Sequence, residues 1–434
     1  MKRVSTRSSA LGPSPTSLLV GVIGLIALGF LVSLAFGTPA VVGVATPFAV
    51  WLVWGLTLDR GRRCTVTMSL DREVAEEGEL VMATITVACD PSWERVVCEV
   101  RVPGGIVTEN PPARFAIEPS RDGRGTATLP LRCVRWGTHE IGPTTVTARN
   151  FFGLFMGHGM ASNSPVVRVY PAALPIRARL ATARTQASVG NQRSRQHGDG
   201  FEFADLRPYM PGDRPHRINW RATARRSDPY VTLQNPEQNS DVILFVDSAA
   251  DVTLGANGTL ACAGRAVAAL ARAHIAARDR VGLIAFGGVL RWLAPGMGTK
   301  HLHRILDTLL DTSVVASYTW PRLEVLPPRT LPLGALIVAL TPLTDPRTVR
   351  TLLNLHGRGH EVVVIEIDPE RFTSCGASPA DVLTQRIWRL YRSARRHRIW
   401  EVGMPLVRWD PSQPLDGAIA ELNQLRQRSW RTLA

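Results

Sequence analysis

The sequence has few cysteines, and their spacing matches no common metal site. Its six cysteines include no C-x-x-C pair and have no histidines beside them at zinc spacing, so a zinc site has no support. We expect buried free thiols, although Cys89 and Cys98 flank a predicted hairpin and could bridge in an oxidising compartment. The sequence also lacks a G-x-S-x-G motif, which removes support for a hydrolase built on that nucleophile turn.

A complete phosphate-binding loop is missing as well. The stretch from Gly296 to Lys300 is rich in glycine, but its threonine precedes the lysine and the required earlier glycine is absent. We interpret this stretch as a turn that begins a helix. His301 and His303 lie two residues apart, on different sides of that helix, and are therefore unsuited to one metal ion.

Acidic residues are scarcer than basic ones: 36 Asp and Glu stand against 50 Lys and Arg, a formal net charge of +14. The arginines are spread along the chain, and no stacking platform for single strands is visible, so we do not expect a nucleic-acid partner. A basic surface that faces anionic lipid accounts for the charge. Nucleic-acid binding is kept as a third hypothesis, which would show steep salt dependence.

Two long apolar runs lie near the beginning of the chain. Residues 18–36 carry no charge, and residues 40–58 repeat the pattern after a short break. Each run is just long enough to cross about 30 Å of hydrocarbon as a helix. Basic residues lie outside both runs, so we expect a cytoplasmic tail over residues 1–17, a transmembrane hairpin over residues 18–58 and cytoplasmic soluble domains at the cell membrane. A cleaved signal peptide followed by an anchor is the competing interpretation.

Short alternating runs separated by turn residues follow the hairpin up to Tyr170. They predict a β-sandwich-like domain over residues 59–171. The aromatic cluster over residues 150–155 could be an exposed binding patch, but a place in the core is the favoured interpretation. Residues 172–197 are basic and polar, and we interpret them as a linker.

The last part of the chain alternates apolar runs with helical segments. The run Val242 to Val246 has no polar alternation and ends at Asp247, as expected of a buried strand. Other strands are predicted over residues 281–286, 335–340, 361–367 and 406–409, and helices over residues 259–277, 299–310, 346–356, 380–400 and 414–427. The pattern predicts an α/β domain over residues 242–434 with a parallel sheet covered on both faces. Ligands bind such sheets at the carboxyl edge, where Asp247, Gly287, Thr341 and Asp345 would cluster.

The most distinctive stretch lies between the linker and this domain, over residues 198–241. It reads FEFADLRPYMPGDRPHRINWRATARRSDPYV and is followed by VILFVDSA, which closely resembles the bacterial family known as domain of unknown function 58. We take as signature or partner-binding residues Glu202, Arg207, Tyr209, Gly212, Asp213, Arg217, Asn219, Trp220 and Arg225. The resemblance implies a von Willebrand factor A-like domain with a Rossmann-type parallel sheet. It also implies an adaptor that works with a MoxR-type AAA+ ATPase in envelope or complex-assembly processes.

A von Willebrand A domain that holds a divalent cation carries D-x-S-x-S after its first strand, with a threonine and a second aspartate from other loops. Here Ala249 replaces the first of these serines and supplies no ligand. The remaining degenerate candidates are Asp247, Ser248, Asp251, Thr299 and Asp345. A site short of ligands does not recover the dehydration of Mg²⁺, so we expect no tightly held ion and no other cofactor. Asp247 would then cap a helix or hold a loop.

Asp213 and the arginines around it form the strongest charged cluster. They could lock the loop onto the sheet around a buried Trp220, or they could form a docking surface, because Arg and Trp dominate interface energetics. We expect stability from Gly212, Asp213 and Trp220, and partner contact from the outlying arginines. The first hypothesis is a membrane-anchored, non-enzymatic adaptor. The second is a Mg²⁺-dependent ligand-binding or enzymatic domain centred on Asp247.

Overall fold

The structure is a computed structural model that divides into two compact units, Met1–Ala172 and Ala173–Ala434. It describes residues 12–433 except 38, 59–63, 91–92, 110–112, 121, 151, 162, 181–201, 211–217, 227, 236–239, 255–256, 313, 316–326, 333, 374–375 and 377. The first unit holds two apolar helices and three mostly antiparallel sheets, with one parallel pair between β3 and β12, and the second holds a mixed sheet with helices.

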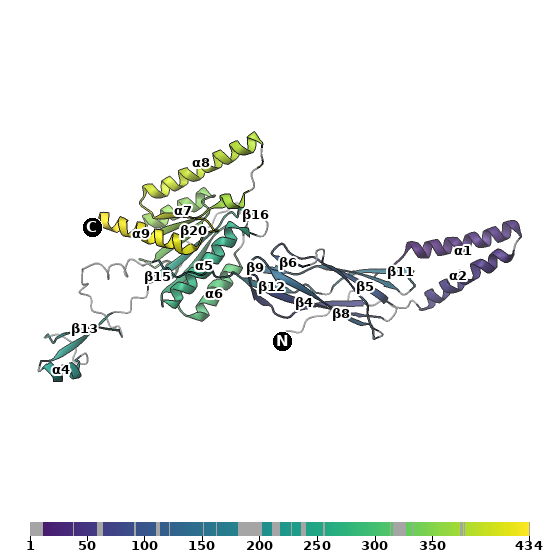
Figure 1. Cartoon of the computed structure of the whole chain (residues 1–434), viewed down its shortest axis with the longest axis horizontal. Coiled ribbons are helices and arrows are strands. Elements are labelled where there is room, and N and C mark those ends of the chain that lie inside the picture. Colours follow the sequence, from purple (N-terminus) through teal and green to yellow (C-terminus); the bar gives the residue numbers. More distant parts are fainter. Residues whose placement is uncertain are drawn as a thin grey trace. The chain divides into compact units, whose positions relative to one another are not determined.

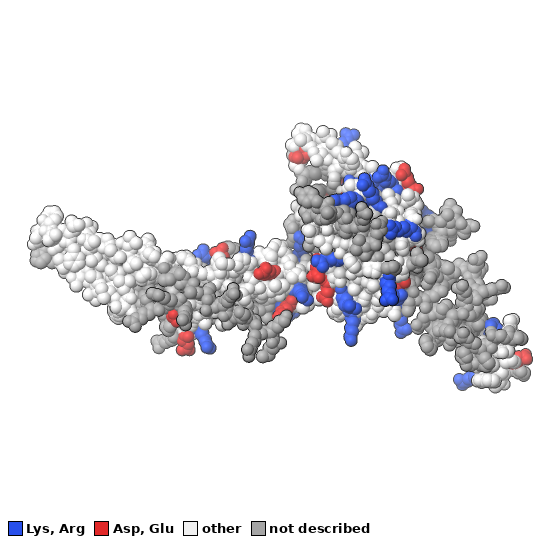
Figure 2. Space-filling view, turned by 180° about the vertical axis from the view of Figure 1, so that it is seen from behind, with Lys and Arg blue, Asp and Glu red and all other residues white. Residues whose placement is uncertain are grey.

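The two apolar runs form the helices α1 (Ser17–Phe36) and α2 (Pro39–Leu58), as the sequence predicts. The Thr16 hydroxyl accepts a hydrogen bond from the Leu19 backbone and caps the first helix. Side chains along both helices are exposed, with Leu34 at 87% exposure as the extreme. Figure 1 shows the two helices running side by side, and Figure 2 shows their surface without Lys, Arg, Asp or Glu. Both helices are long and apolar enough to cross a membrane.

The region after the helices is rich in strands, as predicted. Three sheets have the orders β1-β11-β10-β5-β7, β2-β4-β8-β6 and β3-β12-β9. All three contribute to one hydrophobic core, to which alternate residues of strands such as β2, β4, β10 and β12 point inward. The strands are β1 (Gly12–Pro15), β2 (Cys64–Leu70), β3 (Val74–Glu76), β4 (Leu80–Cys89), β5 (Trp93–Val100), β6 (Ile106–Thr108), β7 (Arg114–Ile117), β8 (Arg124–Cys133), β9 (Gly137–Glu140), β10 (Thr144–Asn150), β11 (Phe155–Met160) and β12 (Val166–Tyr170).

The first strand corrects one expectation about the N-terminal segment. Residues 12–15, predicted as part of a tail, form β1 and pair antiparallel with β11. Proline blocks one ladder bond but is tolerated on an edge strand, and β1 is at the edge of its sheet. The Thr16 hydroxyl then donates to the Gly153 carbonyl over 2.7 Å. The chain therefore leaves this sheet directly into α1.

The aromatic cluster after β10 lies between the sheet and the helix α2 and contacts both. Leu154 is fully buried, as the core interpretation predicts. The Phe152 ring packs against Trp51 and Trp54 of α2, with centroid distances of 5.7 and 6.3 Å. Such aromatic pairs add to the stabilisation that area burial alone provides. The cluster thus fastens the end of the second helix to the sheet.

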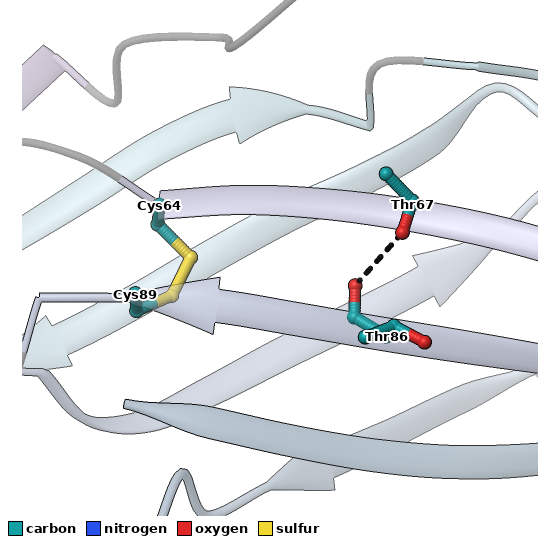
Figure 3. Close-up of a disulfide and its surroundings, with 4 residues drawn as sticks. All are labelled: Cys64, Thr67, Thr86 and Cys89. Carbon is teal, nitrogen blue, oxygen red and sulfur yellow. Dashed lines mark hydrogen bonds between the residues drawn. A yellow bond between two sulfur atoms is a disulfide. The ribbon is translucent and has the colours of Figure 1, made fainter. Parts of the chain in front are cut away.

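Two cysteines form a bond that the sequence does not predict. Cys64 begins β2 and Cys89 ends β4, and the antiparallel register places them directly opposite each other. Their sulfurs are bonded (Figure 3), so the expectation of free thiols is wrong for this pair, and Cys89 does not pair with Cys98. The alternating pattern identifies strands but not their partners, so the pairing does not follow from it. Cys98, Cys133 and Cys262 are buried free thiols, as expected.

A small strand–helix–strand element carries the family signature. Strands β13 (Glu202–Pro208) and β14 (Tyr230–Asn235) pair antiparallel, and the short helix α4 (Trp220–Arg226) lies between them in the chain. Before it, the start of the predicted linker is anchored: Asp416 accepts hydrogen bonds from the backbones of Arg177 and Ala178. Most of the remaining linker lies outside the described residues.

The main sheet of the second unit has the order β19-β18-β15-β20-β21-β22. All neighbours pair parallel except β18 and β19, which pair antiparallel. The sheet is therefore mixed, whereas the sequence predicts a parallel sheet. The link between those two strands is too short for a parallel crossover and forms a hairpin instead. The strands are β15 (Asp241–Ser248), β18 (Arg280–Gly287), β19 (Arg291–Gly296), β20 (Leu336–Thr341), β21 (Glu361–Ile367) and β22 (Leu406–Trp409).

Helices cover both faces of this sheet, as the unbroken apolar runs predict. One face carries Ile243 and Phe245 and packs against Val349 and Ile399 from two helices. The other face is in contact with an Ala-rich helix whose small side chains allow close approach. The helices are α5 (Thr259–Ala276), α6 (Thr299–Leu310), α7 (Pro346–Gly357), α8 (Pro379–Glu401) and α9 (Leu415–Leu433). Short elements complete the unit: β16 (Thr253–Leu254), β17 (Asn257–Gly258), η3 (Pro328–Thr330) and η4 (Pro369–Phe372).

Candidate functional site

The strand order defines where a ligand would bind. Counted along the chain, the sheet order is 3-2-1-4-5-6, the doubly wound order whose direction reverses between its first and fourth strands. Those strands are β15 and β20, and their carboxyl ends carry Asp247 and Thr341. The structure therefore brings together Asp247 and Thr341, as predicted, and Gly287 at the end of β18 pairs with Ser248 beside them.

Asp247 is 2% exposed, and both of its carboxylate oxygens are engaged. The Thr341 hydroxyl donates to Oδ2 over 2.6 Å, and the Ala249 backbone donates to Oδ1 over 3.0 Å. The hydroxyl in turn accepts a hydrogen bond from the Leu343 backbone. Burial raises the pKa of Asp247 to about 6, although these hydrogen bonds oppose the shift. Asp247 therefore holds the loops after both strands, as one of the predicted roles requires.

The other metal candidates serve local structure. Asp251 Oδ1 accepts hydrogen bonds from the Thr259 hydroxyl and the Leu260 backbone at the start of α5. Asp345 caps α7, accepting from the Arg347 backbone over 2.7 Å and pairing with its guanidinium. Ser248 is buried at the end of β15, and Thr299 is the first residue of α6. Within the described residues, no group of three or more His, Cys, Asp or Glu side chains could hold a metal ion.

Arginines of α8 cover the neighbouring part of the edge. Arg392 is 1% exposed and pairs with Glu366 at the end of β21, with Glu370 at 3.2 Å and with Asp368 at 3.6 Å. Burial raises the pKa of Glu366, while Arg392 and Arg396 act in the opposite direction. Arg395 donates to the carbonyls of Leu343 and Thr344 over 2.8 and 2.6 Å, next to the loop that Asp247 holds.

The sequence contains a signal for this network that lies outside the D-x-S-x-S pattern. Arg389, Arg392 and Arg395 recur every three residues on one predicted helix, which places them on one face. Glu366 and Asp368 alternate at the end of a predicted strand. A helix whose arginines face a strand end rich in carboxylates closes that edge with protein groups. The α8 arginines therefore cover the edge at the ends of β20 and β21. Beside the end of β15, a small pocket remains that Ser248, Val289 and Arg291 help to line.

The signature element is built on local hydrogen bonds. Asn219 Oδ1 accepts from the Ala222 backbone and caps α4, and the Asn219 backbone donates to the Tyr230 carbonyl over 2.7 Å. The Tyr209 backbone donates to the Pro229 carbonyl, which ties the two strand ends together. Arg207 donates to the Pro208 carbonyl. Asn219 and Tyr209 thus have positions that shape the element.

Trp220 overturns an expectation. The sequence predicts a buried anchor, but this side chain is 70% exposed at the first position of α4. The start of this helix is fixed by the Asn219 side chain, which caps it. Met210 is 60% exposed, and Arg221 and Arg225 are exposed as well. Gly212, Asp213 and Arg217 lie outside the described residues, as does the side chain of Glu202.

Comparison with known proteins agrees with the resemblance drawn from the sequence. Residues 205–373 match the family model described as "Protein of unknown function DUF58", which confirms the predicted resemblance for this part of the chain. Uncharacterized proteins of Mycobacterium bovis and Mycobacterium tuberculosis are 32% identical over 118 residues, which is 26% of this chain. The chain covers 36% of the length of these curated relatives.

Solved structures give weaker similarities. A type II cohesin domain from the cellulosome of Acetivibrio cellulolyticus has a TM-score of 0.19 at 9% identity, covering 24% of this chain and 94% of its own. A non-cellulosomal cohesin from Archaeoglobus fulgidus has a TM-score of 0.20 at 10% identity, covering 30% and 99%. Scores this low carry no argument about the fold or the function of this chain.

Proposed function

We propose that this chain is a membrane-anchored adaptor without catalytic activity that binds a MoxR-type AAA+ ATPase through its signature element. The exposure of Trp220 is the observation that carries the proposal. A tryptophan that is 70% exposed lowers solubility and contributes little to packing, yet Trp is among the residues most enriched in interface hot spots. Its neighbours Arg221 and Arg225 are exposed and basic, which favours an acidic partner surface.

The covered part of the carboxyl edge supports a non-enzymatic role. Asp247 uses both oxygens on Thr341 and Ala249, and Arg392 and Arg395 occupy the region beside them. A general acid or base must reach a substrate atom, and Mg²⁺ needs several oxygen ligands in near-octahedral geometry, of which Ala249 supplies none. We infer that the second unit has a von Willebrand A-like fold that no longer holds an ion, and that the first unit is a β-sandwich.

The hairpin arrangement supports membrane anchoring with the soluble parts on one side. The strand β1 precedes the first helix and pairs with β11, while α2 ends against Phe152 of the same sheet region. Two consecutive crossings return the chain to the side on which it began. Basic residues before and after the hairpin favour the cytoplasm for that side. We therefore propose a multi-pass protein of the cell membrane with both soluble units in the cytoplasm.

The test is capture of the ATPase by the full-length chain. Tagged protein is purified from its own membranes, and the MoxR-type ATPase of the same cells is quantified in the eluate with ATP, with ADP and without nucleotide. We expect capture in at least one nucleotide state. Trp220→Ala should weaken binding by about tenfold or more, since truncation of a central aromatic anchor costs about that much.

Trp292 offers a matched control. It is 40% exposed on β19 and lies outside the signature element, so Trp292→Ala removes a similar side chain from another surface. Binding equal to that of the unchanged chain is expected for this variant. Absence of the ATPase in every nucleotide state would contradict the adaptor role. Equal losses for both tryptophan variants would contradict the assignment of the binding surface.

A further inference from the structure

The helix α8 turns Arg392 and Ile399 inward and exposes several large apolar side chains on its outward side. Its buried residues are Arg392 and Ile399 alone among the described side chains of the helix. Large apolar side chains on the rest of the surface are exposed: Val382 58%, Leu383 58%, Ile387 45%, Leu390 64%, Tyr391 63% and Trp400 66%. Figure 1 shows this long helix on the outside of the second unit. Contiguous exposed apolar surface of this kind marks an interaction site.

The helix is well defined, so its exposed face is a fixed feature. The Ser378 hydroxyl accepts a hydrogen bond from the Asp381 backbone, and Pro379 occupies the first helical position. Both features begin a helix sharply. In the C-terminal half of the helix, Arg392 forms an ion pair with Glu366, and Ile399 is fully buried in the core. The outward direction of the apolar face is set by these inward contacts.

The apolar residues follow the spacing of a coiled coil. Leu383, Ile387, Leu390 and Ala394 are separated by four, three and four residues, and all four are exposed. This is the a and d spacing of a heptad, with the β-branched residue at an a position and leucine at d, the combination that favours parallel two-stranded pairing. Arg392 then falls at position f, opposite the seam. The burial of Arg392 and the heptad positions therefore indicate the same side of the helix as the side that faces a partner.

A lipid surface is a poorer occupant than a protein. Helices that lie on membranes use free Lys and Arg on the polar face together with the apolar stripe. Here Arg389, Arg392 and Arg396 are paired with carboxylates of the sheet edge, with Arg389 to Glu370 at 2.9 Å. These three guanidinium groups are therefore directed at the sheet edge, and Arg386 and Arg398 remain exposed on the helix. The observations favour a helix with a matching apolar stripe.

We propose that the partner is a second copy of this chain, and that two α8 helices pair in parallel along Leu383, Ile387, Leu390 and Ala394. In that register the g residue of one helix faces the e residue of the other. Arg386 then faces Tyr391 of the second copy, which allows a cation–π contact, and Ser393 faces Arg398. No like charges meet at these flanking positions.

The seam is short, because the next d and a positions are His397 and Glu401. A short seam gives weak pairing in dilute solution. Confinement of both copies to one membrane would raise their effective concentration and give them a common orientation, which suits parallel pairing. This step rests on the proposed anchoring. Retention of the chain in membranes after an alkaline carbonate wash tests the anchoring separately.

The proposal is tested by disulfide crosslinking of the full-length chain in its own membranes. Ala380, Ile387 and Ala394 occupy successive a positions, and each is replaced singly by cysteine. In a parallel pair each new cysteine faces its own copy across the axis, so all three variants should give a dimer under mild oxidation. The unchanged chain sets the background, and Asn354→Cys on the exposed surface of α7 is the control for accessible cysteine.

A second pair of variants tests the seam itself. Val382 and Leu383 are neighbours with equal exposure of 58%, but only Leu383 lies on the seam. In the Ile387→Cys background, Leu383→Glu should lower the crosslinked fraction by about fivefold or more, since it buries a charge. Val382→Glu should leave that fraction unchanged. Both sites are exposed, so neither variant is expected to unfold the domain.

Three results would overturn the proposal. Crosslinking of Ile387→Cys that does not exceed that of the Asn354→Cys control excludes a second copy on this face. Crosslinking of Ile387→Cys without crosslinking of Ala380→Cys and Ala394→Cys indicates an antiparallel pair. A fluorophore attached to the new thiol of Ile387→Cys whose emission shifts with lipid composition rather than with protein dilution identifies the membrane as the occupant.

Discussion

Thr341 donates its hydroxyl to Oδ2 of Asp247 over 2.6 Å, and this bond joins the two strands between which the sheet order reverses. In open α/β sheets the crevice at this point is where ligands bind. Here the crevice is bridged by the protein itself. The same bond gives the aspartate at the end of β15 a structural role, since it holds two loops together.

The burial of Asp247 makes a pH-dependence prediction. Its pKa is raised by burial from 3.8 to about 6, so the folded chain binds a proton more tightly than the unfolded chain. The stabilisation from protonation is complete below pH 3.8 and is lost as the pH rises through about 6. Asp247→Asn should remove this loss. As the pH rises from 3.8 to above 6, the free energy of unfolding of Asp247→Asn should therefore increase by about 3 kcal/mol relative to that of the unchanged chain.

Chemical denaturation of the full-length chain at a series of pH values measures this difference. Asp311→Asn is the control, because the Asp311 side chain is 64% exposed and contacts Arg291 only at 3.9 Å. The control should follow the unchanged chain at every pH. A difference between Asp247→Asn and the unchanged chain that does not vary with pH would show that the carboxylate is not the titrating group.

The absence of a tightly held cation is a separate prediction. Both oxygens of Asp247 already accept hydrogen bonds, and Ala249 supplies no ligand. We therefore expect calorimetric titration of Mg²⁺ or Mn²⁺ into the full-length chain to give only heats of dilution, identical to those of Asp247→Ala. A saturable heat in the unchanged chain that disappears in Asp247→Ala would support the alternative of a Mg²⁺-dependent domain.

Arg392 is expected to be the most sensitive residue of the edge network. Its removal would leave Glu366, which is fully buried, without its main counter-charge. We expect Arg392→Met to lower the free energy of unfolding by about 3–5 kcal/mol. Arg389→Ala should cost less than about 1 kcal/mol, because that side chain is 54% exposed and its pair with Glu370 is screened by solvent.

The double variant Glu366→Leu with Arg392→Met checks the cause. If the cost comes from an isolated buried charge, replacing both partners by apolar residues should restore most of the stability. Thermal unfolding followed by circular dichroism measures all three variants. A double variant that is no more stable than Arg392→Met alone would mean that packing of the arginine stem, rather than charge, dominates.

The parts of the fold that follow from local pattern were predictable. Uncharged runs identified both apolar helices, and unbroken apolar runs identified the buried strands β15, β18, β20 and β21. Features that depend on pairing between distant segments were not. The strand β1 contains two prolines and has no apolar alternation, so only its register with β11 reveals it. The Cys64–Cys89 bond depends in the same way on the register of β2 with β4.

In the candidate site, too, features that follow from local sequence were predictable, and features that depend on distant segments were not. The missing ligand at Ala249 could be seen in the sequence, and the structural role of Asp247 follows from it. The partner of Asp247 could not be named, because Thr341 lies on a strand that is adjacent only in the folded sheet. The prediction for Trp220 was wrong because burial was inferred from residue type, and residue type does not determine which side of a short helix faces solvent.

The cysteine pair of the first unit provides a test of the proposed cytoplasmic side. A disulfide is typical of oxidising compartments, and the cytoplasm keeps thiols reduced. The sheet register holds Cys64 opposite Cys89 in either compartment. In the proposed cytoplasmic location we expect the bond seen in the structure to be reduced in cells that are lysed directly into an alkylating reagent, and to form when isolated membranes are oxidised with diamide. Burial raises the pKa of Cys98 to about 11, so this thiol should stay unmodified in the folded protein.

Mass spectrometry of the alkylated peptides distinguishes the two states. Cys64→Ser should abolish the linked peptide pair after oxidation and leave Cys89 open to alkylation. Cys133→Ser is the matched control, because Cys133 is a buried free thiol of the same unit and its loss should leave the bond intact. A Cys64–Cys89 bond that is already present in directly trapped cells would place the first unit in an oxidising compartment. Because both ends of the hairpin join that unit, this single result would reverse the proposed orientation of the whole chain.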